Sequence, residues 1–341
     1  MTVMLHETDL NNIITILLNQ QFKIIAPTQD EDQSILQPIT QSSQWHRTHL
    51  NTRNSIKDFL LPIREELFHF TQQGEIHETT PSTQETVFWG IRPCDAQAVH
   101  RLDLVFRSAP EDEYYVAKRQ TSILVGLACN TPNPTCFCTS LNGGPHNTFG
   151  LDVILTQLED TYLLDAVSEK GQRILDLAQP ISHSPTQEQL TQATLMKQRA
   201  EAQIIRKIDH STLRTRLQHS FDTEYWRKAA QLCINCGICT FLCPTCHCFN
   251  ITDEEMHRVK FWDSCQFKTY SKHANGHNPR GQSYQRLRNR ILHKFLYFQQ
   301  NFGHYLCVGC GRCNLYCPMH LDLTVMVANV NLPGERQVDK Q

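Results

Sequence analysis

Apolar residues in the first part of the chain repeat with two different periods. From Leu10 to Gln20 they recur at the spacing of an amphipathic helix, and residues 22–27 (FKIIAP) predict a short strand closed by Pro27. Residues 55–70 (SIKDFLLPIREELFHF) predict a helix that Pro62 begins or breaks. Helices and strands therefore alternate along this segment, which is typical of an α/β domain.

Two continuous apolar runs predict buried strands, and a cysteine follows each of them. Residues 85–91 (ETVFWGI) lead through Cys94 and Asp95 into a predicted helix over residues 96–106. Residues 121–129 (TSILVGLAC) end at Cys129. In an open α/β sheet ligands bind beyond the carboxyl ends of the strands, so these cysteines are candidate ligand residues.

The chain then changes character twice. Residues 130–150 are rich in Pro, Gly, Asn and Thr and predict one long loop, which contributes Cys136 and Cys138. Residues 151–167 predict a β-hairpin that turns at Glu159 and Asp160. A helical, Gln-rich pattern follows over residues 172–221, interrupted between Pro180 and Pro185.

These patterns predict a mixed fold, α+β or α/β, with two domains. We expect an N-terminal α/β domain over residues 1–180 and a mainly helical domain over residues 186–341. A chain of 341 residues is long enough for two or three hydrophobic cores.

Composition narrows the class of protein. The formal charge of −2 offers no general attraction to nucleic acid. No stretch approaches the ~18 consecutive apolar residues of a membrane span, so direct membrane insertion is not expected. The N-terminus MTVMLHETDL lacks the basic and apolar regions of a secretory signal, which predicts a cytoplasmic protein. Fifteen cysteines are the unusual feature.

Eight of these cysteines form two C-x2-C-x2-C-x3-C-P runs, the spacing of paired [4Fe–4S] clusters. In such pairs the first three thiolates of a run bind one cluster, and the fourth binds the neighbouring cluster. The first predicted ligand set is Cys233, Cys236, Cys239 and Cys317. The second is Cys307, Cys310, Cys313 and Cys243. The two runs must then meet in one ferredoxin-type module, although 63 residues separate Cys243 from Cys307.

Other uses of these cysteines fit less well. Structural zinc sites usually take paired C-x2-C knuckles with four ligands, not regular triplets followed by Cys-Pro. Disulfides belong to oxidising compartments, and no sequence signal sends this chain to one.

Seven cysteines remain. Cys94, Cys129, Cys136 and Cys138 are four in number, enough for a third [4Fe–4S] cluster, but their scattered origin equally allows small buried thiols. In that second case Asp95 is a turn or helix N-cap residue. Cys246, Cys248 and Cys265 are open to a metal site, a redox-active pair or simple packing, and packing is favoured.

A basic amphipathic helix is predicted over residues 284–298, between the two cysteine runs. Leu287, Ile291 and Phe295 form its apolar stripe. Its cations would offset cluster charge, dock an acidic partner, or simply face solvent. They are Arg286, Arg288, Arg290 and Lys294.

Glycines add two observations. Gly237 and Gly311 each follow a predicted ligand, where they would let backbone N–H groups approach cluster sulfurs. The chain contains neither G-x-G-x-x-G nor G-x4-G-K-[ST], so no nicotinamide, flavin or phosphate site is predicted. Two-electron chemistry would therefore need a partner with its own cofactor.

Several motifs resemble one family over roughly residues 55–341. They are WGIRPCDAQAVHRLDLVF at 89–106, CFCTS at 136–140, CINCGICTFLCPTCHCF at 233–249, WDSCQF at 262–267 and CVGCGRC at 307–313. The sequence resembles the 4Fe–4S dicluster subunits of cytoplasmic oxidoreductases. These are the beta subunit of nickel–iron sulfhydrogenases and the corresponding dicluster subunit of anaerobic sulfite reductase.

The resemblance implies a non-catalytic subunit of an oxidoreductase complex. It would relay single electrons between an FAD- and NAD(P)-binding subunit and a catalytic subunit of hydrogenase or sulfite reductase type. The similarity includes Cys94, Cys129, Cys136 and Cys138. Two other functions stay open: an iron–sulfur redox sensor, and a stand-alone enzyme with an N-terminal cysteine-bound metal site.

Overall fold

A seven-stranded sheet forms the centre of the computed structural model, which describes residues 2–330. Its strand order is β1-β9-β8-β7-β6-β2-β3. The four inner strands run parallel: β2 (Lys23–Asp30), β6 (Thr86–Ile91), β7 (Ser122–Leu127) and β8 (Val153–Leu158). The outer strands pair antiparallel: β1 (Thr2–His6), β9 (Thr161–Ala166) and β3 (Gln33–Ile39).

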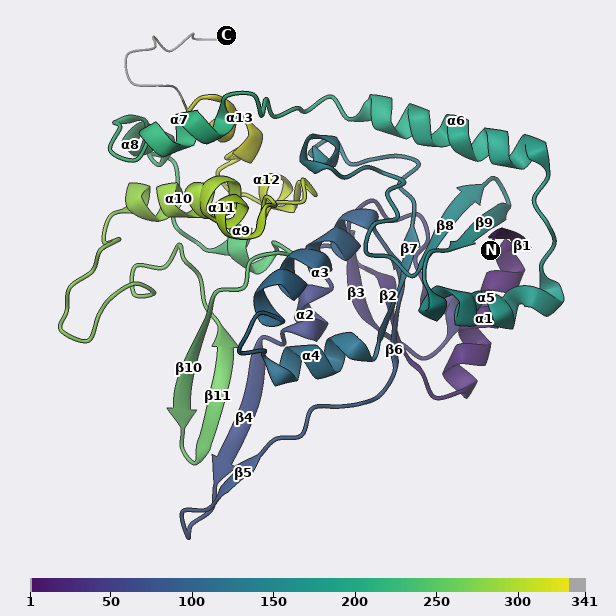
Figure 1. The fold of residues 1–341 in the computed structure, drawn as a ribbon, viewed down its shortest axis with the longest axis horizontal. Helices are drawn as coiled ribbons and strands as arrows, with labels where there is room; N and C mark the ends of the chain where they lie inside the picture. The colour runs from purple at the N-terminus through teal and green to yellow at the C-terminus, as the bar shows by residue number, and fades with distance from the viewer. Residues whose placement is uncertain (1, 331–341) are drawn as a thin grey trace.

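Helices cover both faces of this sheet, giving three layers (Figure 1). Helices α1 (Glu7–Asn19) and α5 (Glu169–Ala178) lie on one face. Helices α2 (Lys57–Leu60), α3 (Pro93–Phe106) and α4 (Glu113–Gln120) lie on the other. Strand β6 is almost continuously apolar because both of its faces are buried. Val87 and Trp89 pack in the core on the side of α1 and α5, and Phe88 packs in the core on the side of α2, α3 and α4.

Most elements predicted for this part are confirmed. The helix near Leu10, the strands before Cys94 and Cys129, the helix α3 and the 151–167 hairpin all form. The 130–150 segment is a loop with one short 3-10 turn, η2 (Cys138–Leu141). The predicted break follows α5 as a 3-10 turn, η3 (Gln179–Ile181). Another such turn, η1 (Ser42–Gln44), follows β3.

Two predictions were wrong. Strand β2 does not end at Pro27 but continues to Asp30. Its parallel pairing with β6 already stops at Ile25, so the N–H group that Pro27 lacks would have had no partner in β6. The helix expected over residues 55–70 exists only as α2, and β4 (Arg64–Phe70) follows it as a strand. Pro62 ends the helix, and β4 pairs with a strand from far along the chain.

That partner strand belongs to a second, antiparallel sheet of order β10-β11-β4-β5. It combines β4 and β5 (Ile76–Glu78) with β10 (Phe249–Glu254) and β11 (His257–Trp262). The sheet projects away from the three-layer body (Figure 1). Buried Lys260 of β11 ties it to that body through Asp112, the residue before α4, at 2.9 Å, and it also pairs with Glu65 of β4 within the sheet, at 2.7 Å. Strands from both sides of the expected 180–186 division thus share one sheet, and the division itself stays a prediction.

The C-terminal part gathers short helices around the two cysteine runs, except for the 17-residue helix α6 (Gln187–Gln203), which lies apart from them over β8 and β9 (Figure 1). The helices before and within the first run are α6, α7 (Leu213–His219), α8 (Tyr225–Ala229) and α9 (Ile238–Phe241). Those after it are α10 (Ser283–Leu292), α11 (Phe298–Phe302), α12 (Arg312–Leu315) and α13 (Leu323–Ala328). A π-helical turn, η4 (His293–Tyr297), joins α10 to α11.

The predicted basic helix is therefore confirmed, with a π turn at its middle. Its stripe of Leu287, Ile291 and Phe295 is buried, as expected, and packs near Trp226 in the C-terminal part. Within residues 2–330, no helix has the length and apolar character needed to cross a membrane.

Candidate metal centres

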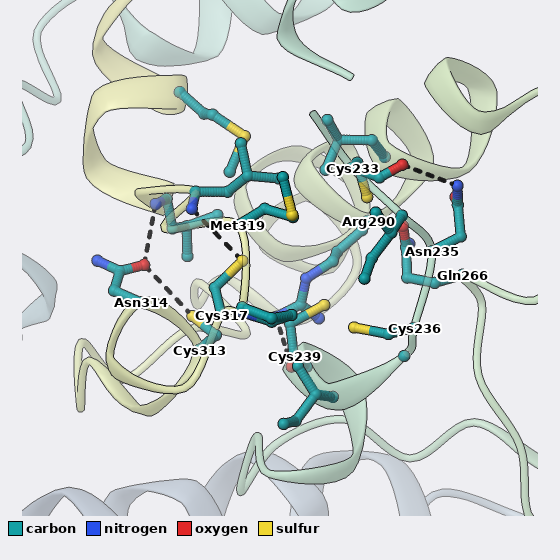
Figure 2. Close-up of a pocket in the computed structure, with 18 of the residues that line it drawn as sticks. Cys233, Asn235, Cys236, Cys239, Gln266, Arg290, Cys313, Asn314, Cys317 and Met319 are labelled. Carbon is teal, nitrogen blue, oxygen red and sulfur yellow. Dashed lines mark hydrogen bonds between the residues drawn. The ribbon is translucent and has the colours of Figure 1, made fainter. Parts of the chain in front are cut away.

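Cysteines from both runs line one pocket, which we call the first cysteine pocket. Figure 2 shows their side chains around a shared space. The cysteines are Cys233, Cys236, Cys239, Cys313 and Cys317. Leu287, Ile291 and Met326 contribute apolar walls. The pocket therefore unites the four residues of the first predicted ligand set, together with Cys313 of the second.

The first run reaches this pocket through a tight turn. Gly237 has a φ of 78° and begins α9, which carries Cys239. A Cβ atom at Gly237 would lie 2.8 Å from the Phe267 ring, so the backbone path requires glycine. Asn235 donates to the Cys233 carbonyl at 3.1 Å and to Ser283 Oγ at 2.9 Å, which fixes the run against α10.

The second predicted set also comes together. Cys243, Cys307 and Cys310 are buried, and Cys313 is half-buried. Burial raises the pKa of the Cys307 thiol to about 12, and the nearby Cys243 adds to that rise. Cys243 likewise raises the pKa of Cys310 and of Cys313, after burial in both cases. Cys243, from the first run, thus lies among the three leading cysteines of the second run.

The four N-terminal cysteines converge as well, in what we call the N-terminal cysteine pocket. Its cysteines are Cys94, Cys129, Cys136, Cys138 and Cys310. Cys94 lies in the first turn of α3, directly after β6, and Cys129 follows β7. Because β6 and β7 are parallel, both residues emerge at the same edge of the sheet, as predicted.

The loop that carries Cys136 packs tightly on the second run. Phe137 N–H donates to the Gly309 carbonyl at 2.9 Å, and Asn51 Nδ2 donates to the Cys310 carbonyl at 2.9 Å. A Cβ atom at Gly309 would lie 2.6 Å from the Cys138 backbone, and one at Gly311 would collide with Thr135. The second cysteine set consequently lies between the other two, sharing Cys313 with one pocket and Cys310 with the other.

A buried ion pair reinforces this contact. Arg312, just after Cys310, is fully buried and lies 2.9 Å from Asp95 Oδ1, while Asp95 is 1% exposed. A second bond, at 3.1 Å, joins Arg312 Nη2 to Asp95 Oδ2. The interpretation of Asp95 as only a turn or N-cap residue is therefore wrong, because its carboxylate anchors the second run to α3.

The basic residues of α10 and the π turn are buried, so the alternative of a solvent-facing surface is wrong for them. They are Arg286, Arg288, Arg290 and Lys294. Lys294 Nζ lies 3.2 Å from Cys243 Sγ, and Arg290 Nη1 lies 3.1 Å from Cys246 Sγ. The pKa of the Cys243 thiol is lowered, chiefly by its hydrogen bond with Cys246, and Lys294 and Arg290 add to the effect.

Cys246, Cys248 and Cys265 line neither pocket. Cys246 packs beside Cys243, and Cys248 beside Cys265, where each pair shares a hydrogen bond that shifts both thiol pKa values. Gln266 Nε2 also donates to Cys265 Sγ at 3.5 Å. In the part of the chain that the structure describes, no group of three or more His, Cys, Asp or Glu side chains is placed to hold a single metal ion.

The cysteine pockets fit iron–sulfur clusters by their donors and surroundings. Each offers at least four sulfur donors, and the first cysteine pocket has apolar walls. Burial raises the pKa of the thiols of Cys94, Cys129 and Cys136, in the last case to about 12. Metal binding would deprotonate these thiols and offset that desolvation.

Three further residues support the pockets, and none of them was predicted to do so from the sequence: Asn51, Lys57 and Arg92. Besides Asn51, Lys57 donates to the carbonyls of Thr240, at 3.2 Å, and Phe241, at 2.9 Å. Arg92 donates to the carbonyl of Ala128 at 2.9 Å, next to Cys129. All three bind backbone carbonyls distant in sequence, so no local spacing could have revealed them.

Comparison with known proteins relates the segment with the two cysteine runs to a family of iron–sulfur domains. A family model described as the 4Fe-4S dicluster domain matches residues 232–321. Sulfhydrogenase 2 subunit beta of Pyrococcus furiosus is 32% identical over 271 residues, 78% of this chain and 79% of that protein. A chain of the F420-reducing [NiFe] hydrogenase complex from Methanosarcina barkeri is 11% identical with a TM-score of 0.38, over 64% of this chain and 92% of that one.

Proposed function

The chain belongs to the family of sulfhydrogenase beta subunits, and we propose that it is the iron–sulfur electron-transfer subunit of a hydrogenase-type oxidoreductase complex. The observation that carries the proposal is the convergence of cysteines from three distant segments on adjoining sites. The dicluster family match supports iron–sulfur clusters as their ligand.

We assign the ligands as follows. One [4Fe–4S] cluster takes Cys233, Cys236, Cys239 and Cys317, whose side chains line the first cysteine pocket. A second takes Cys243, Cys307, Cys310 and Cys313. In both sets the fourth thiolate comes from the other run, which ties the two runs into one module.

A third [4Fe–4S] cluster is proposed in the N-terminal cysteine pocket, on Cys94, Cys129, Cys136 and Cys138. The 14-residue helix α3 begins at Pro93, so its partially positive N-terminus lies beside this pocket. A thiolate-ligated cluster is anionic, and a helix N-terminus stabilises anions. Cys310 borders the same pocket and places this site next to the second set.

When bound, these clusters supply one-electron transfer, which is the chemistry of a relay between two partners. The protein's own residues bury the sites, orient the thiols and balance their negative charge. Arg312 and Asp95 hold the second run against α3, while Lys57 holds the first run through the carbonyls of Thr240 and Phe241.

A partner can approach the first cysteine pocket directly. Cys236 is exposed, and three apolar side chains within two residues of a pocket cysteine along the chain are exposed as well: Leu232 (58%), Ile234 (59%) and Leu315 (42%). Exposed apolar side chains beside a redox site are typical of a protein interface. We propose that this end meets one partner and that the sheet-edge end serves the other.

The two partners we propose are an FAD- and NAD(P)-binding reductase subunit and a catalytic subunit. Neither nucleotide-binding motif occurs in this chain, which supports a separate flavin carrier. The Pyrococcus furiosus relative is named as a sulfhydrogenase subunit, which favours a hydrogenase over a sulfite reductase as the catalytic partner.

An iron and acid-labile sulfide count on anaerobically purified protein tests the ligand assignment, together with EPR of the dithionite-reduced state. We expect about twelve iron atoms per chain, four for each [4Fe–4S] cluster. A count of about eight iron atoms would mean that the chain binds only the paired clusters and none in the N-terminal pocket. Zinc in place of iron would overturn the whole proposal.

Two variants locate the third cluster. Cys136→Ser should lose about four iron atoms per chain, because it removes one N-terminal ligand. Cys265→Ser is the matched control, since Cys265 lies outside both pockets, and it should keep the full count. Equal iron in both variants would place no cluster on Cys136.

The relay itself is tested by reduction with NAD(P)H. The isolated chain should stay oxidised with NAD(P)H, and its visible absorbance should bleach once the flavoprotein that co-purifies from the native host is added. Bleaching by NAD(P)H alone would contradict the relay, and specific retention on DNA without a flavoprotein partner would favour a sensor instead.

A further inference from the structure

Two buried cations lie on one helical segment beside the cysteine sets. Arg290, in the last turn of α10, is 3% exposed, and Lys294, in the π turn, is 1% exposed. Residues four apart on a helix share one face, and both side chains here point toward cysteine sulfurs.

Lys294 contacts the second cysteine set through Cys243. Its Nζ donates to Cys243 Sγ at 3.2 Å and to Thr245 Oγ1 at 3.0 Å. Its backbone carbonyl accepts the Leu306 N–H at 2.9 Å, directly before Cys307. Isolated π turns are frequent at functional sites. This one anchors the second run and delivers a cation to the thiol that crosses over from the first.

Arg290 lies between the two sets. Arg290 lines the first cysteine pocket (Figure 2). Its guanidinium donates to Cys246 Sγ at 3.1 Å and to the Cys239 carbonyl at 2.7 Å. Because it borders the pocket that Cys239 and Cys313 share, its charge acts on both sets.

Neither cation has a carboxylate partner within ion-pair distance among residues 2–330; their bonds go to sulfur, hydroxyl and carbonyl groups. A buried charge without a counter-ion is strongly unfavourable. Thiolate-ligated clusters supply that negative charge, so the site is electrically complete only when they are present.

We propose that Arg290 and Lys294 are fixed positive charges that raise the reduction potentials of the paired clusters. Lys294 raises the potential of the cluster held by Cys243, Cys307, Cys310 and Cys313. Arg290 raises the potentials of both clusters. This inference rests on the proposed iron–sulfur function. Reduction adds one negative charge, and a nearby fixed cation stabilises the reduced state more than the oxidised state.

EPR-monitored redox titration of the whole, cluster-loaded protein tests this. Lys294→Gln should make one cluster at least about tenfold harder to reduce, which for one electron corresponds to about 59 mV toward negative potential. Arg290→Gln should shift two clusters in the same direction. Lys294→Arg keeps the charge and should restore most of the wild-type potential.

Arg288→Gln is the matched control. Arg288 is also a buried cation on α10, but it stacks on Phe221 at 3.6 Å and donates to that residue's carbonyl. The Arg288→Gln substitution should leave all cluster potentials unchanged. If the loss of any buried arginine altered the potentials through the structure, this variant would show the same shift.

The outcomes separate the two proposals. Wild-type protein without [4Fe–4S] signals would refute the iron–sulfur function itself. Clusters present at unchanged potentials in Lys294→Gln and Arg290→Gln would refute this inference alone. Loss of clusters from both neutral variants, with retention in Lys294→Arg and Arg288→Gln, would assign the cations to cluster assembly and would also overturn it.

Discussion

At the scale of single residues, burial decides what each titratable group does. The cysteines of the N-terminal pocket have raised pKa values because burial disfavours the thiolate. Asp95 and Arg312 remain buried because their opposite charges pair with one another. The same reasoning applies to a buried histidine beside the N-terminal pocket.

His146 should make the fold sensitive to acid. Burial, and then Lys197, lower the pKa of His146 from 6.5 to about 4, and its Nε2 has no hydrogen-bond partner among the described residues. The unfolded chain binds a proton below pH 6.5 while the folded one does not, so stability falls as the pH drops from about 6.5 to 4. At about 1.36 kcal/mol per pKa unit, the loss is about 2 kcal/mol by about pH 5.

Urea unfolding at about pH 7 and about pH 5 measures this loss. In His146→Gln the difference in unfolding free energy between the two pH values should shrink by about 2 kcal/mol. His219→Gln, at an exposed position, should leave the difference unchanged. An unaltered pH difference in His146→Gln would show that His146 titrates normally.

At the scale of elements, the second cysteine run is fitted against a loop from the N-terminal part. Gly311 has a φ of 72° and begins α12, with Thr135 so near that no Cβ atom fits. Gly303 ends α11 with nearly the same φ, 71°, yet nothing lies within 4 Å of its Cβ position. The two glycines therefore share a backbone conformation and differ in their neighbours.

This difference gives a matched prediction. Gly303→Ala should cost about 1–2 kcal/mol of stability, the strain of a left-handed alanine. Gly311→Ala should cost more and lose iron, because Thr135 must move away from the second run. Iron content and urea unfolding of both variants check this. Equal losses of stability and iron would mean that Thr135 can move aside without cost.

At the scale of the whole molecule, the two parts of the chain are interlocked. Strand β11 pairs with β4, Lys57 binds the carbonyls after Cys239, and Arg312 binds Asp95. The 1–180 and 186–341 division remains our proposal for the domains, but each part contributes buried polar groups whose partners lie in the other.

Separate expression of the two parts tests this dependence. Residues 186–341 alone should fail to keep the iron of the paired clusters, because buried groups such as Lys260 would lose Glu65 and Asp112. Co-expression with residues 1–180 should restore iron and solubility. A C-terminal fragment that folds alone with about eight iron atoms would show that the interlocking is dispensable.

The sequence alone determined what depends on local spacing. The two cysteine runs, the strands that end before Cys94 and Cys129, and the apolar stripe around Ile291 all follow from neighbours along the chain. Tertiary structure decided the rest. The segment after Pro62 is a strand because β11 pairs with it, Cys310 borders the N-terminal pocket because a loop packs on it, and Lys294 is buried because its partners come from elsewhere. Long-range pairing and burial involve residues far apart in sequence, so no local period records them.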